Sequence, residues 1–252
     1  MKISIITVSL NSETFINDCL ASVNQQNYND IEHIIIDGGS TDKTINIVKK
    51  YSHIKKIVSE PDKGIYDAMN KGIEIATGEI IGFLNSDDFY ANDYVLSNVA
   101  DIFIKQNHVD ACYADMIYTS KFDISKNIRY WKSSKFFPGL FSKGWCPPHQ
   151  TFFARRSIYE KFGFFNLEYS IASDVELMMR FLEVNKINTL YVSELWIKMR
   201  MGGTTNKSFK NILFQNKEVL HALKRHNLSV NFISFILNKF ISRSLQFLKS
   251  LK

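Results

Sequence analysis

Two adjacent carboxylates, Asp87 and Asp88, follow an apolar run of strand length at residues 80–84. At the end of a parallel strand, paired carboxylates in a turn are hard oxygen ligands that suit Mg²⁺ or Mn²⁺, and these ions hold phosphate oxygens. The alternative is that both residues cap the next helix, because Asp is a preferred cap and turn residue. Taken alone the pair favours a cap, and the surrounding sequence shifts the balance to a metal and diphosphate site.

Short apolar runs alternate with helical patterns through the first 90 residues. The runs predict strands at 3–8, 31–36, 54–59 and 79–84, and the patterns between them predict helices at 12–26, 41–51 and 64–76. This alternation predicts an α/β fold, a mostly parallel sheet with helices on both faces. Ligands bind such sheets at the carboxyl ends of the strands.

The predicted strand ends are polar. Ser9 and Asn11 follow the first strand, Asp37 follows the second, and the segment EPDK at 60–63 follows the third. Together with the carboxylate pair, these ends predict a crevice for a polar ligand that carries phosphate. The sequence has no G-x-G-x-x-G after the first strand and no G-x-x-x-x-G-K-[ST], which disfavours the common dinucleotide and P-loop modes.

The composition fits a globular protein with an appendage. The chain has 252 residues, of which 45% are hydrophobic, so it can bury one sizeable core. Its three cysteines, Cys19, Cys112 and Cys146, are widely spaced, which favours reduced thiols over a disulfide framework or a zinc site. The segment MKISIITVSLN predicts a first strand rather than a signal peptide. We therefore expect a cytoplasmic protein.

The positive charge is concentrated in the last part of the chain. Residues 198–252 hold 11 Lys and Arg and the single acid Glu218, a net charge of +10, whereas residues 1–197 carry −4. Residues 232–252 predict a basic amphipathic helix without an apolar run long enough to span a bilayer. We expect this helix to lie on the anionic inner face of the cytoplasmic membrane. The alternative is that its apolar stripe packs on the body of the protein or on a second subunit of a homodimer.

Four segments resemble, in order, the motifs of the family 2 glycosyltransferases of the GT-A fold. They are TVSLN at 7–11, IIIDGGSTDKT at 34–44, EPDKGIYDAMNKGIEIATGEIIGFLNSDD at 60–88 and IASDVELMMR at 171–180. The resemblance is strongest to small bacterial enzymes that build O-antigen, capsule and exopolysaccharide. It implies a GT-A catalytic domain at 1–205 with a helical extension at 206–252.

The resemblance also implies an activity. It is the inverting transfer of a sugar from a nucleotide-sugar donor, UDP-linked by expectation, to a saccharide acceptor. The acceptor is expected to be linked to polyprenyl diphosphate, and the cofactor to be a divalent metal, Mn²⁺ or Mg²⁺.

Several residues receive nucleotide-binding roles from the resemblance. Asp37 stands where the family's Asp accepts a hydrogen bond from uracil, with an Asx-turn into the following glycines as the alternative. The turn that contains Thr7, Ser9 and Asn11 lies under the base and ribose. The next motif contains Lys63, Asp67 and Asn70 and packs its helix against the nucleotide. Lys63 can also be a solvated loop charge.

The metal motif departs from the family pattern. Asn85 stands where the first acid of D-x-D often occurs, which removes one charge. We expect Asp88 to bind the metal and Asp87 to bridge ribose or metal.

Asp174 stands at the position of the family's general base. A carboxylate there takes the proton from the acceptor hydroxyl while that oxygen attacks the anomeric carbon. The alternative makes Asp174 a helix cap and Glu176 a first-turn acid that interacts with the helix dipole.

Four residues are candidates for contact with the acceptor or the leaving group. Trp145 closes an acid-free segment of basic and aromatic residues at 129–145, which fits an anionic amphipathic acceptor or ordinary surface lysines. The other three are His149, Glu176 and Arg200. Arg200 precedes GGTT at 202–205, which fits either a mobile flap over the diphosphate or a linker.

Two other functions are alternatives. A sugar-nucleotide nucleotidyltransferase also needs a carboxylate-metal site, but no glycine-rich basic loop follows the first strand. A nucleic-acid binder would use the basic tail. The continuous apolar stripe in that tail is not needed for contact with DNA, so we expect no nucleic-acid partner.

Overall fold

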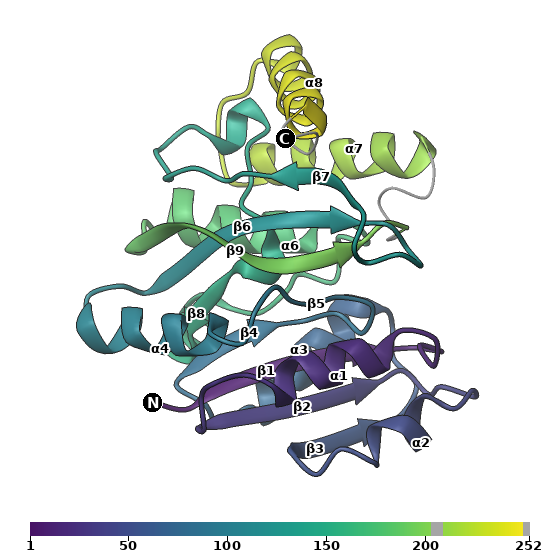
Figure 1. The fold of residues 1–252 in the computed structure, drawn as a ribbon. Helices are drawn as coiled ribbons and strands as arrows, with labels where there is room; N and C mark the ends of the chain where they lie inside the picture. Colours follow the sequence, from purple (N-terminus) through teal and green to yellow (C-terminus); the bar gives the residue numbers. More distant parts are fainter. Residues whose placement is uncertain (203–208, 249–252) are drawn as a thin grey trace.

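The computed structural model describes residues 1–202 and 209–248, which fold around one nine-stranded sheet (Figure 1). Across the sheet the strand order is β3-β2-β1-β4-β8-β6-β9-β5, and β7 pairs with β6. The strands are β1 (Ile3–Ser9), β2 (Ile31–Asp37), β3 (Ile54–Ser59), β4 (Ile80–Phe83), β5 (Phe89–Tyr90), β6 (Ala111–Thr119), β7 (Asn127–Trp131), β8 (Phe153–Arg155) and β9 (Thr189–Arg200).

Helices cover both faces of this sheet. They are α1 (Ile16–Asn24), α2 (Thr44–Val48), α3 (Ile65–Ile75), α4 (Val95–Lys105), α5 (Arg156–Phe162), α6 (Ser173–Met179), α7 (Phe209–Arg225) and α8 (Phe232–Leu248). Short turns occur at Phe141–Lys143 and His149–Thr151, and a π-helical turn at Arg180–Val184 continues α6. The α/β fold predicted from the sequence is confirmed.

The strand pairing divides the sheet into two parts. The first four strands pair in parallel, and so do β6 and β9. β8 joins the two parts by pairing antiparallel with both β4 and β6. The elements β5 and β7, which the sequence pattern did not predict, extend the second part as antiparallel strands. β5 has only two residues, too few to give a periodic signal.

The first helix begins four residues later than its pattern predicted. Ser12 belongs to the loop, because its backbone N–H donates to Thr44 Oγ1 at 2.8 Å and its hydroxyl lies 2.8 Å from that of Ser86. Helix α1 therefore starts at Ile16. The loop after β1 is held by contacts with the loops after β2 and β4.

Side chains of β1 alternate between two cores. Ile3 and Ile5 pack with α1 and α4, whereas Ile6 and Val8 pack with α3 and the helices on the other face. A Cβ on Gly72 would lie 2.4 Å from Ile6 Cγ2, so glycine is needed for α3 to pack this close to the sheet. The close approach brings the first turn of α3 to the carboxyl ends of the strands.

Helices α7 and α8, which we expected to form an extension, share the main core. Val219, Ala222 and Leu223 of α7 and Phe235 of α8 pack into the core that covers one face of the sheet. Helix α8 also packs on β7, at the top of Figure 1. Neither α7, α8 nor any other helix in the described ranges has the length and apolar character needed to cross a bilayer.

Candidate active site

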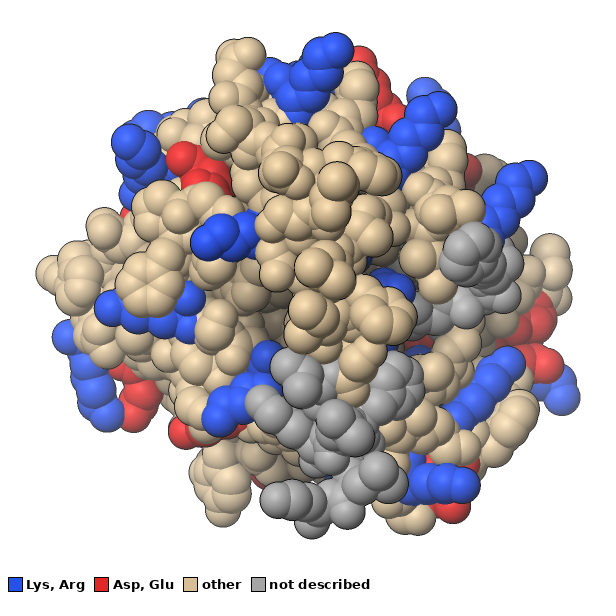
Figure 2. Space-filling model, turned by 90° about the horizontal axis from the view of Figure 1, so that it is seen from above, with Lys and Arg blue, Asp and Glu red and all other residues tan. Residues whose placement is uncertain are grey.

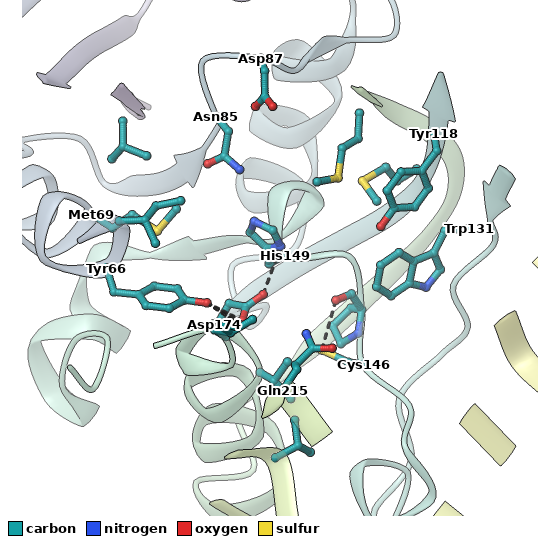
Figure 3. Close-up of a pocket in the computed structure, with 18 of the residues that line it drawn as sticks. Tyr66, Met69, Asn85, Asp87, Tyr118, Trp131, Cys146, His149, Asp174 and Gln215 are labelled. Carbon is teal, nitrogen blue, oxygen red and sulfur yellow. Dashed lines mark hydrogen bonds and ion pairs between the residues drawn. The ribbon is translucent and has the colours of Figure 1, made fainter. Parts of the chain in front are cut away.

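A cleft of about 800 Å³ extends from the carboxyl ends of β1 and β4 to α8 (Figure 3). We call its first side the strand-end wall, which consists of Ser9, Asn11, Asn85 and Asp87. The two loops that form it meet because β1 and β4 pair in parallel and end at the same edge. The sequence prediction of a polar crevice at this edge agrees with the structure.

Asp174 lies across the cleft from Asn85 and Asp87, at the second residue of α6 (Figure 3). Its Oδ1 is 3.0 Å from the hydroxyl of Tyr66, and its Oδ2 is 3.2 Å from Nδ1 of His149. Burial raises the pKa of Tyr66 well above its usual value, and the charge of Asp174 adds to this effect. The phenol therefore stays protonated and donates to the carboxylate.

The backbone before α6 is held from the C-terminal part of the chain. Glu218 of α7 accepts hydrogen bonds from the amides of Ser170, Ile171 and Ala172, at 2.7, 2.9 and 2.9 Å. Ala172 is the residue before the first turn of α6. The single acid of the basic C-terminal segment thus fixes the backbone that leads to Asp174.

Asp88 occupies a different place from the one we expected. Its side chain is fully buried and does not line the cleft, whereas Asp87 does. Its carboxylate accepts hydrogen bonds from the Gln150 side chain and, at 3.0 Å, from the backbone N–H of Arg200. Burial raises the pKa of Asp88 well above its usual value, and the neighbouring charge of Asp87 adds to the rise. Asp88 therefore joins the loop after β4 to the turn at His149–Thr151 and to the end of β9.

Asp37 is also buried, and it does not line the cleft. Its oxygens accept hydrogen bonds from Ser9 Oγ at 3.0 Å, from Ser59 Oγ at 2.7 Å and from the backbone of Ser40 at 2.9 Å. Burial alone would raise the pKa of Asp37, but the hydrogen bonds from Ser40, Ser59 and Ser9 outweigh it and lower the pKa. The carboxylate holds the loop after β2, as the Asx-turn alternative described.

Two further candidates point into the protein rather than into the cleft. Thr7 is fully buried, and its hydroxyl lies 3.0 Å from Nε2 of His33. Glu176 is buried between Arg180 and His226, at 3.0 and 2.7 Å. Burial would raise the pKa of Glu176, but these two partners lower it. Their side chains face inward because each lies on the core side of its strand or helix.

The residues of the third motif support the cleft from outside. Asp67 accepts a hydrogen bond from the backbone N–H of Lys63 at 3.0 Å, and the Lys63 side chain is exposed. Asn70 bonds to both the N–H and the carbonyl of Phe165, each at 2.9 Å. None of the three motif residues lines the cleft. They fix α3, whose first turn carries Tyr66.

Trp145 and Arg200, two candidates for ligand contact, differ in position. Trp145 lines the cleft and packs edge-on against Phe141, with ring centroids 5.4 Å apart. Arg200 is buried, pairs with Asp18 and donates to the backbone carbonyl of Asp87 at 2.7 Å. Arg200 thus shapes the loop that presents Asp87. The GGTT segment that follows it lies outside the described residues from 203 onward.

The family model of glycosyl transferase family 2 matches residues 4–163. The chain belongs to this family. It is 32% identical over 193 residues to the PGL/p-HBAD biosynthesis glycosyltransferases of Mycobacterium bovis and Mycobacterium tuberculosis, which covers 75% of this chain and 73% of theirs. An uncharacterized glycosyltransferase of Haemophilus influenzae is 41% identical over 111 residues, 42% of this chain and 44% of that protein. The family expected from the four motifs is confirmed.

Solved structures confirm the GT-A fold of this glycosyltransferase. The S. aureus TarS fragment 1–349 in complex with UDP-GlcNAc has a TM-score of 0.67 and 19% identity, over 98% of this chain and 73% of that one. This chain spans 44% of the longer TarS chain. The mannosyltransferase PcManGT from Pyrobaculum calidifontis, in complex with GDP-Man and Mn²⁺, has a TM-score of 0.66 and 16% identity, over 96% and 73% of the two chains.

The strand-end wall of the glycosyltransferase offers oxygen ligands for a divalent cation. Asp87 supplies a carboxylate, and Asn85 Oδ1 is a buried atom without a hydrogen-bond partner among the described residues. Within those residues no group of three His, Cys, Asp or Glu side chains is placed to hold a metal. Mg²⁺ is commonly bound by one or two carboxylates together with substrate phosphates. The residues present therefore fit a cation that takes its other ligands from a diphosphate and water.

Sequence reasoning missed four contributors to the site of the glycosyltransferase. Tyr66 lies inside the motif at 60–88, where only its neighbours received roles, although a tyrosine in a polar first helical turn is a signal. Glu218 had a stronger signal, because it is the single acid in the last 55 residues. Lys239 and Arg243 were assigned to a membrane face, and both line the cleft.

Proposed function

We propose that this chain transfers a sugar from a UDP-linked donor to a saccharide acceptor with inversion of configuration, using Asp174 as the general base. The position of Asp174 carries this proposal. Tyr66 and His149 contact its two oxygens, and it lies across the cleft from Asn85 and Asp87. A donor diphosphate near those two residues would place its sugar between them and the base.

In the proposed reaction Asp174 takes the proton of the acceptor hydroxyl as its oxygen forms a bond to the anomeric carbon. The bond from that carbon to the diphosphate breaks at the same time, and its electron pair leaves with UDP. Tyr66, which donates to Oδ1, keeps the carboxylate turned toward the cleft. A bound Mn²⁺ or Mg²⁺ would neutralise charge on the departing diphosphate. Asp87 and Asn85 are the residues proposed to hold it.

The proposed function is tested by UDP release from a panel of UDP-sugars in the presence of MnCl₂. Asp174→Asn is expected to lower the rate at least about hundredfold, the usual scale for loss of a general base. Thermal stabilisation by UDP should remain, because Asp174 is far across the cleft from the nucleotide side. Asp101→Asn, on the exposed face of α4, is the matched control. Full activity in Asp174→Asn would refute the assignment.

We further propose that the enzyme works on a lipid-linked acceptor at the inner face of the cytoplasmic membrane, in the synthesis of a bacterial surface polysaccharide such as O-antigen. Helix α8 exposes a row of apolar side chains: Phe232 at 60%, Ile233 at 76%, Leu237 at 56% and Phe240 at 70%. Figure 2 looks down on this end of the molecule, where Lys and Arg, with some Asp and Glu among them, lie around a wide uncharged area. An apolar centre with a cationic rim suits an anionic bilayer surface.

Sedimentation with vesicles tests the membrane proposal. The full chain is expected to bind vesicles that contain about one quarter phosphatidylglycerol and to bind phosphatidylcholine vesicles less. The triple variant Ile233→Ser, Leu237→Ser, Phe240→Ser should lose most of this binding. Ile104→Ser, an equally exposed apolar residue on α4, should not. Unchanged binding of the triple variant would favour the second-subunit alternative, which the oligomeric state in solution would then check.

A further inference from the structure

Helix α8 turns polar and cationic side chains, together with Phe235, toward the cleft and leaves several of its described apolar side chains exposed. The residues that it turns to the cleft are Phe235, Lys239, Ser242, Arg243 and Gln246, which recur at helical spacing on one side. The apolar residues Ile233, Leu237 and Phe240 face outward. A helix normally buries its apolar stripe and exposes its charges. The cations on this side of α8 instead line the cleft.

A third cation from another element joins the two on α8. Arg129 of β7 lines the same part of the cleft, is 5% exposed, and has its guanidinium carbon 3.9 Å from the centre of the Tyr118 ring. Burial lowers the pKa of Arg129, Tyr118 opposes this effect, and the charge of Arg243 adds to it. Arg243 lines the same cleft. We call Arg129, Lys239 and Arg243 the cationic wall.

Lys239 and Arg243 of the cationic wall bring like charges together on one side of the cleft, and Asp174 is a carboxylate whose charge acts on Lys239. None of the ion pairs within residues 1–202 and 209–248 includes Lys239 or Arg243. Lys239 Nζ instead donates to the neutral side chain of Asn216 on α7, at 2.6 Å. Clustered cations in a partly buried site repel one another and lose hydration, so an anion that enters between them is bound favourably.

Building on the proposed function, we propose that the cationic wall binds a phosphate group of the acceptor and so presents the acceptor hydroxyl to Asp174. The wall and the strand-end wall lie in one cleft that also contains Asp174. Tyr118 and Trp131 stack nearly parallel beside Arg129, with ring centroids 6.4 Å apart, and give an apolar surface next to the charges. The donor diphosphate and the acceptor phosphate then occupy separate parts of the cleft.

Calorimetric titration of inorganic pyrophosphate into the full chain saturated with UDP, in buffer without divalent metal that pyrophosphate would chelate, tests this subsite. The double variant Lys239→Gln, Arg243→Gln is expected to bind pyrophosphate at least about tenfold more weakly. The control Lys217→Gln, Lys224→Gln removes two exposed charges from α7 and should leave this binding unchanged. UDP affinity and UDP-sugar hydrolysis should be preserved in the double variant, which separates failure of the subsite from failure of the proposed function.

Three outcomes would overturn the proposal. The first is a loss of UDP affinity in the double variant equal to its loss of pyrophosphate affinity, which would assign the wall to the donor. The second is unchanged pyrophosphate binding in the double variant. The third is binding of glucuronate as tight as that of pyrophosphate, which would assign the wall to a carboxylate. Farnesyl diphosphate should bind as well as pyrophosphate or better. Much tighter binding would support a lipid-borne phosphate, and equal binding would support a soluble one.

The pH dependence of pyrophosphate binding gives a second measurement. Burial, followed by the charge of Arg243, lowers the pKa of Lys239 to about 8, against smaller opposing effects of Cys146 and Asp174. Asn216, which it contacts from α7, does not titrate. Lys239 is therefore charged below about pH 8 and neutral above it, and pyrophosphate binding should weaken between pH 7 and 9 in the wild type. A Lys239→Gln single variant should bind weakly throughout this range, and identical profiles would contradict the proposal.

Discussion

The hydroxyl of Tyr66 lies 3.0 Å from Oδ1 of Asp174, although the two residues are 108 positions apart in the chain. The same hydroxyl lies 2.9 Å from the carbonyl oxygen of Ile171, two residues before α6 begins. Tyr66 therefore contacts both the proposed base and the backbone that carries it. Helix α3 brings it there because Gly72 lets that helix pack close to β1.

Replacing Tyr66 with Phe should reduce catalysis more than donor binding. The carboxylate of Asp174 would keep its contact with His149 but lose its hydrogen bond from Tyr66, so its direction would be less fixed. We expect kcat to fall about tenfold to hundredfold, the scale on which lost positioning acts, with the KM for the donor little changed. Steady-state kinetics check this, with Tyr51→Phe as control because its hydroxyl bonds Asn17. An unchanged kcat would remove Tyr66 from the positioning of the base.

Glu218→Gln should weaken both folding and activity. The amide keeps one acceptor oxygen for three backbone N–H groups, and its NH₂ group faces donors. Leaving buried donors unpaired costs about 1–3 kcal/mol each, so the free energy of unfolding should fall on that scale. Urea unfolding and kcat measured under folding conditions test the two effects. Glu160→Gln, an exposed partner of Arg156, is the control and should change neither.

Asp87 and Asp88 should respond differently to the same substitution. Asp87→Asn removes a cleft-facing carboxylate and should raise the Mn²⁺ concentration for half-maximal activity at least about tenfold, because metal sites depend on anionic oxygen ligands. Asp88→Asn turns an NH₂ group toward Gln150 or the N–H of Arg200, and should lower stability by about 1–3 kcal/mol instead. Metal titrations and thermal unfolding of both variants check this. The reverse pattern would return the metal role to Asp88.

Stability should depend on pH through His33. Burial, followed by the nearby His53, lowers the pKa of His33 to about 3. Between this value and the usual pKa of about 6.5 the unfolded chain binds a proton that the folded chain does not, so stability falls as pH decreases, by up to about 1.4 kcal/mol per unit. The raised pKa of Asp88 acts in the opposite direction.

The contribution of His33 is therefore measured as the difference between the pH dependence of stability in the wild type and in a His33 variant. Urea unfolding at pH 7 and pH 5.5 should show a steeper loss of stability in the wild type than in His33→Gln. The control His108→Gln, at an exposed position, should keep the wild-type dependence. Equal dependence in the wild type and His33→Gln would contradict a buried neutral His33.

The local sequence determined the elements and the family. Alternating apolar runs and helical patterns placed the first four strands and three helices in order, because hydrophobic periodicity reports which side of an element is buried. The same patterns placed polar residues at the strand ends, and four motifs gave the family that the match at residues 4–163 confirms. Asp174 could be singled out because the motif at 171–180 places a carboxylate where the transfer reaction needs a general base.

Only the tertiary structure decided which polar residues face the cleft. Asp87 and Asp88 are neighbours with the same chemistry, yet one lines the cleft and the other is buried against Gln150 and Arg200. Side-chain direction depends on the local turn and on partners distant in sequence, which no local pattern reports. For the same reason Glu218 and the cationic face of α8 emerged only from the packing of the C-terminal helices, where residues more than 40 positions apart meet.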